Sequence, residues 1–86
     1  MIRNLVYTRR AEKDIKKLDS SIRNHIGKAF LKLQDNPLSY SEKLSNPMLG
    51  TYKFRIGDYR VIFDIEGNDI VILRVGHRRE IYKSRR

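Results

Sequence analysis

The stretch TYKFRIGDYRVIF, residues 51–63, indicates the fold most clearly. Its aromatic and aliphatic residues alternate with Lys53 and Arg55, which is the period of a strand with one apolar face and one basic face. Gly57-Asp58 then predicts a tight two-residue turn, and residues 59–65 read as a second strand. The stretch therefore predicts a β-hairpin.

Residues outside this hairpin supply two helices and further strands. Residues 2–7 are β-prone, and Thr8 can cap a helix whose apolar positions recur at helical spacing up to Leu18. Residues 19–21 offer a second cap, and a wider apolar stripe follows until Asn36-Pro37. We therefore expect a helical hairpin after the first strand.

The remaining segments complete the predicted topology. Residues 37–50 hold two prolines, three serines and one asparagine without periodicity, which favours a surface loop. Residues 66–69 form another turn, and the nearly continuous apolar run at 70–75 suits a central strand. The predicted fold class is α+β: one compact domain over residues 1–86, in the order strand, helix, helix and three strands. Its antiparallel sheet would pack the helical hairpin on one face and leave the other for a ligand.

Composition bounds the function. The chain has 86 residues, a hydrophobic fraction of 40% and no cysteine, so a single globular domain without a disulfide scaffold or a thiolate metal site is expected. Its N-terminus lacks the apolar stretch of a signal peptide, and no apolar run reaches membrane-spanning length. A cytoplasmic location without a membrane partner is expected.

Positive charge is the strongest compositional signal. The chain carries 19 Lys and Arg against 10 Asp and Glu, a formal net charge of +9, which attracts polyanions. In a two-residue hairpin Arg55 faces Arg60, with Lys53 on the same face. Like charges opposite each other destabilise a sheet, so an anion such as phosphate would explain the patch, unless the long side chains simply splay into water.

The C-terminal segment adds a second basic cluster. The third strand of an antiparallel sheet returns toward the basic hairpin, so Gly76-His77-Arg78-Arg79 should emerge beside it. Tyr82 follows, and a tyrosine among arginines can stack a nucleobase, although packing is the more common role of a lone tyrosine. The two histidines, His25 and His77, lie on different predicted elements without an acidic cluster, so neither a metal nor a cofactor is expected.

Three segments carry a resemblance to a known family: Tyr7–Leu18, Leu49–Phe63 and Leu73–Tyr82. The first resembles the opening of the RelE/ParE toxin superfamily, a strand and then a helix rich in Ala, Lys and Leu. The other two are similar to its two signature segments, and the resemblance covers nearly the whole chain. It implies a RelE-like toxin of a type II toxin–antitoxin pair, with a fold similar to microbial ribonucleases.

Within this superfamily the basic residues favour the RelE branch, which implies a metal-independent endoribonuclease that cuts mRNA in the ribosomal A site. The partners implied are a RelB-like antitoxin and mRNA on the 30S subunit, with operator DNA contacted only through the antitoxin. The catalytic set carried over is Lys53, Arg60, Arg78 and Tyr82. The RNA- or phosphate-binding set comprises Arg55, Arg74, His77, Arg79 and Lys83.

Two other functions use the same scaffold. A ParE-like toxin would inhibit DNA gyrase without catalysis, using the basic tail as a contact surface. A plain nucleic-acid-binding module would use the cations for phosphate alone. The tyrosine among the basic residues favours the enzyme, because phosphate binding does not need it.

Overall fold

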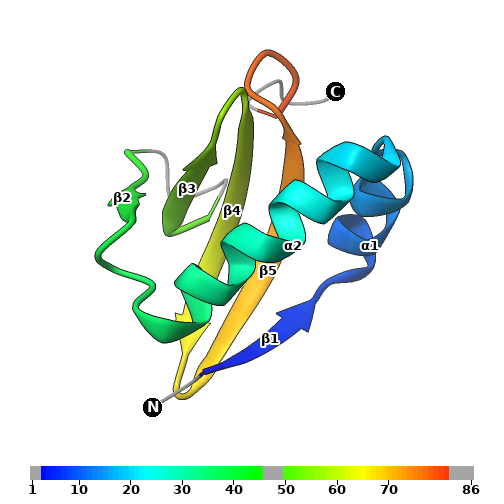
Figure 1. Cartoon of the computed structure of the whole chain (residues 1–86). Helices are drawn as coiled ribbons and strands as arrows, with labels where there is room; N and C mark the ends of the chain where they lie inside the picture. Colours follow the sequence, from blue (N-terminus) through cyan, green and yellow to red (C-terminus); the bar gives the residue numbers. More distant parts are fainter. Residues whose placement is uncertain (1–2, 46–49, 82–86) are drawn as a thin grey trace.

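The computed structural model describes residues 3–45 and 50–81 and shows one layer of helices on a five-stranded sheet (Figure 1). The elements are β1 (Asn4–Tyr7), α1 (Arg9–Lys16), α2 (Ser20–Asp35), β2 (Ser41–Lys43), β3 (Tyr52–Ile56), β4 (Tyr59–Glu66) and β5 (Asp69–His77). The sheet order is β1-β5-β4-β3-β2. The predicted α+β class is confirmed.

Both helices begin at the predicted caps. The Thr8 hydroxyl accepts a hydrogen bond from the Ala11 N–H, at 3.1 Å, and the Asp19 carboxylate accepts from the Ser21 N–H, at 3.2 Å. Such side-chain acceptors satisfy N–H groups that have no partner within the helix. The Ser21 bonds lower the pKa of the Asp19 carboxyl. α2 ends at Asp35, before Asn36-Pro37, as predicted.

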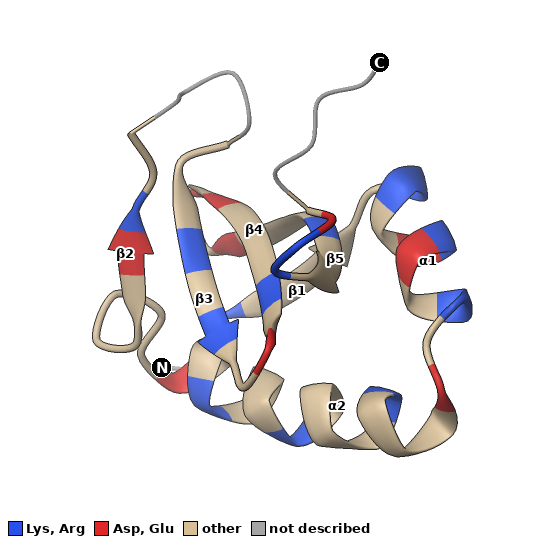
Figure 2. Ribbon diagram, turned by 90° about the horizontal axis from the view of Figure 1, so that it is seen from above, with Lys and Arg blue, Asp and Glu red and all other residues tan. Residues whose placement is uncertain are grey.

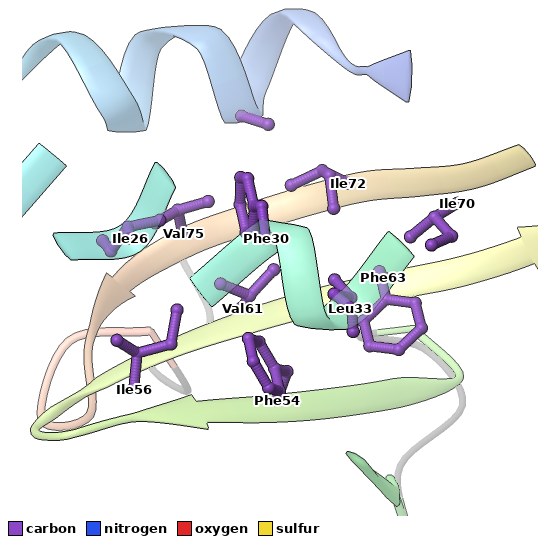
Figure 3. Packing of buried hydrophobic residues seen from close by; sticks show 11 residues of the cluster. Ile26, Phe30, Leu33, Phe54, Ile56, Val61, Phe63, Ile70, Ile72 and Val75 are labelled. Atoms are coloured by element: carbon purple, nitrogen blue, oxygen red, sulfur yellow. The ribbon is translucent and has the colours of Figure 1, made fainter. Parts of the chain in front are cut away.

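The core fills the space between the helices and one face of the sheet (Figure 3). Ile26, Phe30 and Leu33 recur along one side of α2 and are buried. They meet alternate residues of β3, β4 and β5, so the apolar half of each strand faces the helices. The buried strand residues of this cluster are Phe54, Ile56, Val61, Phe63, Ile70, Ile72 and Val75.

The hairpin predicted at Gly57-Asp58 is confirmed. Ile56 pairs with Tyr59 across a two-residue turn, and Gly57 has φ +59°. Glycine adopts this left-handed region without the steric cost that a Cβ atom brings. Arg55 lies opposite Arg60, as the turn length predicted.

Two details of the sheet correct the predicted topology. The first strand was expected in an antiparallel sheet, but β1 runs parallel to β5, from Asn4 opposite Asp69 to Tyr7 opposite Ile72. The sheet is therefore mixed, because the chain crosses the helices and three strands before it returns beside β1. Residues 41–43, assigned to a loop, form β2 and pair with β3 as an edge strand.

The sheet face away from the helices is partly covered. Ile62 and Ile81 are almost completely buried, although neither belongs to the core under the helices. A Cβ on Gly76 would lie 3.8 Å from the Cβ of Ile81, so the turn after β5 folds back onto this face. Gly50 lies close to Ile62 and Leu73 on this face. The face expected to be free is thus divided into an apolar part and a basic part.

Neither helix in residues 3–45 and 50–81 is long and apolar enough to span a membrane.

Candidate active site

A basic strip on β3 begins the candidate site. Phe54 and Ile56 point into the core, so the alternation of the strand places Lys53 and Arg55 on the opposite face. Arg60 lies opposite Arg55 on β4 and shares this face, because its neighbour Val61 belongs to the core. Figure 2 shows these basic segments of β3 and β4 near those of the turn after β5. We call Lys53, Arg55, Arg60 and Arg78 the cationic face.

Glu42 lies next to the cationic face. It pairs with Lys53 in the register of β2 and β3, and its Oε1 atom lies 3.5 Å from Lys53 Nζ and 3.8 Å from Arg55 Nη2. The side chain is 59% exposed, so it remains open to solvent and to a ligand. Sequence reasoning missed Glu42 because a three-residue polar strand shows no alternation of apolar and polar residues. Only its pairing with β3 brings it to the site.

Arg60 is the most buried cation of this face, with 9% of its surface exposed. Its Nη1 group donates hydrogen bonds to the carbonyl oxygens of Gly57, at 2.7 Å, and Tyr59, at 2.9 Å. The guanidinium therefore folds back over the β3–β4 turn. Nη1 supplies both bonds, which leaves the Nε and Nη2 N–H groups of the guanidinium outside them.

Arg78 reaches the same turn from the end of β5. Its backbone N–H donates to the carbonyl oxygen of Asp58 at 2.7 Å, and its Nε lies 3.7 Å from Asp58 Oδ1. The Arg78 side chain is 52% exposed. The predicted convergence of the two basic segments is therefore confirmed in the backbone, and Arg78 presents an exposed guanidinium at the turn over which Arg60 folds.

His77 lies apart from these cations. It follows the core residue Val75 by two positions and pairs with Tyr59, whose ring it meets edge-on at a centroid distance of 5.4 Å. Strand alternation therefore places His77 on the helix side of the sheet, away from Lys53. Its Nδ1 accepts a hydrogen bond from the Arg79 N–H at 3.1 Å, so the ring helps to hold the turn after β5.

The other predicted phosphate ligands are distributed as follows. Arg74 Nε lies 2.8 Å from Asp14 Oδ2 of α1, and this carboxylate oxygen also accepts from the Val75 N–H at 3.0 Å. Arg74 thus joins a helix to the sheet. Arg79 is exposed in the turn after β5, while Tyr82 and Lys83 lie outside the described residues.

Within the described residues, His, Asp and Glu form no group of three that could hold a metal ion. The cationic face combines guanidinium and ammonium donors with two nearby carboxylates, Glu42 and Asp58. Guanidinium groups bind phosphate oxygens in a forked geometry, and a carboxylate can accept a proton. The arrangement is chemically suited to a phosphodiester.

Relatives of this chain are toxins. The family model described as the ParE toxin of the type II toxin-antitoxin system, parDE, matches residues 5–82. Toxin RelG of Mycobacterium tuberculosis is 36% identical over 80 residues, which cover 90% of this chain and 92% of that protein. Toxin RelE3 of Methanocaldococcus jannaschii is 31% identical over 74 residues, which cover 81% and 84%.

Solved structures share the fold. The RelBE2 toxin–antitoxin complex from Mycobacterium tuberculosis contains a chain with a TM-score of 0.81 and 31% identity, covering 90% of this chain and 99% of that chain. The RelB–RelE complex from Methanococcus jannaschii contains one with a TM-score of 0.73 and 26% identity, covering 94% and 99%.

Fold and site together define a small α+β toxin domain with a basic sheet face. The chain belongs to the RelE/ParE toxin superfamily of type II toxin–antitoxin systems and, within it, to the RelE-type branch.

Proposed function

We propose that this toxin is a ribosome-dependent endoribonuclease that cleaves mRNA in the A site and thereby inhibits translation. The observation that carries the proposal is the gathering of Lys53, Arg55, Arg60 and Arg78 on one sheet face, with Glu42 beside them. A row of cations binds an RNA backbone, and the carboxylate gives the same face a group that can move a proton.

The reaction needs no metal ion. The RNA 2′-OH loses its proton and attacks the adjacent phosphorus, the bond to the 5′-oxygen breaks, and a 2′,3′-cyclic phosphate and a protonated 5′-OH result. We assign Glu42 as the proton acceptor, because its exposed carboxylate lies within 4 Å of two cations that would hold the phosphate. Lys53, which belongs to the predicted catalytic set, then binds the phosphate as an ammonium group.

The two arginines stabilise the transition state. The phosphorane carries more negative charge than the starting phosphate. A positioned guanidinium therefore stabilises the transition state more than the bound substrate, which lowers the activation barrier. Arg60 is positioned by its two carbonyl bonds, and Arg78 by its backbone bond to the same turn. Arg55 orients the backbone of the substrate, and Tyr82 stacks a base or orients the nucleophile.

The ribosome supplies the geometry of the substrate. Arg55 and Arg78 of the cationic face have more than half of their side-chain surface exposed, so we infer that in-line attack relies on an RNA held from outside. A substrate on the ribosome places this protein in the cytoplasm.

The partner we propose is a RelB-type antitoxin, because two of the similar structures are RelB–RelE-type complexes. A net charge of +9 favours an acidic segment of that partner over the cationic face. Contact with operator DNA would come through the antitoxin.

The test incubates the purified chain with ribosomes programmed with a defined message and maps the cuts by primer extension. Cuts within the A-site codon are expected, much faster than on the same RNA free in solution. Equal rates on free and ribosome-bound RNA would contradict ribosome dependence.

The name of the matching family model favours one second function, inhibition of DNA gyrase. A supercoiling assay with the same preparation separates the two functions. Loss of supercoiling without any cut in the message would replace the nuclease by a ParE-type inhibitor.

A further inference from the structure

A groove of about 350 Å³ lies between α2 and the end of β3. Its rim carries His25, Lys28 and Lys32 from the helix and Arg55 from the strand. Phe54 and Ile56 form an apolar floor, and Tyr40 closes one side. The groove is separate from the face where Lys53 and Arg60 lie, and it touches that face through Arg55.

The groove exists because β2 is short. Its pairing with β3 reaches only to Ser41 opposite Phe54, so Arg55 and Ile56 have no β2 residue beside them. Tyr40, immediately before β2, is 53% exposed at this point. α2 passes over the same end of β3, and Figure 2 shows basic segments of both elements there.

Charge and an aromatic ring give the groove a definite chemistry. The spacings of three and four residues place His25, Lys28 and Lys32 on one face of α2. Among described residues, the lining contains no carboxylate. Glu42, 3.8 Å from Arg55, is an acid at its border. Cations beside an exposed aromatic ring are the usual features of single-stranded nucleic-acid sites.

We propose that this groove binds one nucleotide of single-stranded RNA outside the cleavage site. Lys28 and Lys32 hold its phosphate, Tyr40 stacks on its base, and Arg55 joins the groove to the cationic face. The inference rests on the proposed function in that the protein acts on RNA, but it does not require cleavage. The RNA is either the message itself or a ribosomal RNA strand, which present the same chemistry.

The first experiment measures the affinity of the full chain for a labelled, fully 2′-O-methylated single-stranded RNA of about ten nucleotides. The methyl groups block the nucleophile, so binding is read without cleavage. Lys28→Ala/Lys32→Ala should lower the affinity at least tenfold. It should also reduce the slope of log affinity against log salt by about 0.7, from the loss of the one phosphate contact that the two lysines share.

Tyr40→Ala should weaken binding roughly fivefold to a hundredfold, the range for one lost base stack, with little change in the salt slope. The matched control is Lys13→Ala/Lys16→Ala, which removes the same charge from exposed positions of α1. If the two double variants lose the same RNA affinity, the effect comes from net charge and not from the groove, and the proposal is overturned. Unchanged RNA affinity with weaker antitoxin binding would also overturn it, in favour of an acidic protein segment.

A second experiment identifies the RNA. A photoreactive amino acid at position 40 is crosslinked on ribosomes that carry a labelled message. A crosslink to the message or to ribosomal RNA supports the proposal and names the source, whereas crosslinks to protein alone contradict it. A chain that binds through the groove but cuts no message would refute the nuclease and leave the groove intact.

Discussion

Facing arginines at the turn of β3 and β4 create a local electrostatic problem. Arg55 and Arg60 stand directly opposite each other, and such like-charged pairs destabilise a sheet. Each is relieved by a different partner: Arg60 by the carbonyl oxygens of Gly57 and Tyr59, and Arg55 by Glu42. The chain thus supplies part of the negative charge that the sequence pattern assigned to a phosphate alone.

Arg78→Ala should lower the single-turnover cleavage rate on programmed ribosomes by roughly ten- to a thousandfold, the range for a lost charge-stabilising donor. Ribosome binding should weaken much less. The fold should remain, because the Arg78 side chain is half exposed and its backbone bond to Asp58 stays. Arg10→Ala on α1 is the control for net charge. If the cleavage rates of both variants fall only in proportion to their ribosome affinity, Arg78 serves in docking and not in catalysis.

Arg60→Ala should lower the same rate and also destabilise the chain, since it removes the two carbonyl bonds of a buried side chain. The loss expected is about 1–3 kcal/mol. Denaturant unfolding measured beside the cleavage assay separates the two effects. A variant with full activity and lower stability would assign Arg60 to the hairpin alone.

Glu42→Gln keeps the size of the side chain and removes its ability to accept a proton at neutral pH. If Glu42 is the general base, cleavage should fall roughly a hundred- to ten-thousandfold, and the acid limb of the pH–rate profile should disappear. Glu12→Gln, an exposed position of α1, is the control. A reduced rate with the acid limb unchanged would show that Glu42 only positions Lys53 and Arg55.

α1 and β5 are joined at a place where the sheet has no further strand. β1 pairs with β5 only as far as Ile72, so the edge of β5 beyond it faces the helix. There one oxygen of Asp14 accepts from both Arg74 Nε and the Val75 N–H. The helix thus continues the hydrogen bonding that β1 leaves incomplete.

Asp14→Ala should lower the free energy of unfolding by about 1–3 kcal/mol, because it leaves the Val75 N–H and the Arg74 guanidinium without this acceptor. The measurement is denaturant unfolding monitored by circular dichroism. Glu12→Ala, on the same helix and exposed, should change stability by less than about 0.5 kcal/mol. Equal small effects would mean that the Asp14 contact contributes nothing to docking of α1.

On the scale of the whole molecule, the sheet carries two apolar layers of unequal size. The larger lies under the helices. The smaller, on the opposite face, includes the buried Ile62 and Ile81, with Gly76 against Ile81 and Gly50 against Ile62 and Leu73. This second layer therefore holds the turn after β5, up to Ile81, against the sheet.

Gly50→Ala should therefore be strongly destabilising. Gly50 has φ +151°, and a Cβ there would lie 2.5 Å from Ile62 Cγ2 and 2.9 Å from Leu73 Cδ1. Overpacking of this kind costs roughly 1–3 kcal/mol. Gly27→Ala is the opposite control: nothing lies within 4 Å of its added Cβ in α2, so a gain of about 0.5–1 kcal/mol is expected. The measurement is the midpoint temperature of thermal unfolding for each variant. A shift in the same direction for both variants would contradict this account.

The two capped helices, the hairpin at Gly57-Asp58 and the basic strip of Lys53 and Arg55 were all predictable from the amino-acid sequence. These features depend on neighbours within one turn or one strand, so local periodicity and turn chemistry predict them. The family also followed from the sequence, because its signature segments are continuous stretches.

The features that join distant segments became visible in the folded chain and were not predictable from the sequence. The parallel pairing of β1 with β5, the edge strand that carries Glu42, and the Asp14 contact with Arg74 depend on which elements meet in the folded chain. The local sequence does not indicate which distant segment will pair with it. Each of these segments alone reads as a polar loop, a β-prone stretch or a helix surface. Packing against the core fixes them, since buried apolar faces and unpaired backbone groups are satisfied in this one arrangement.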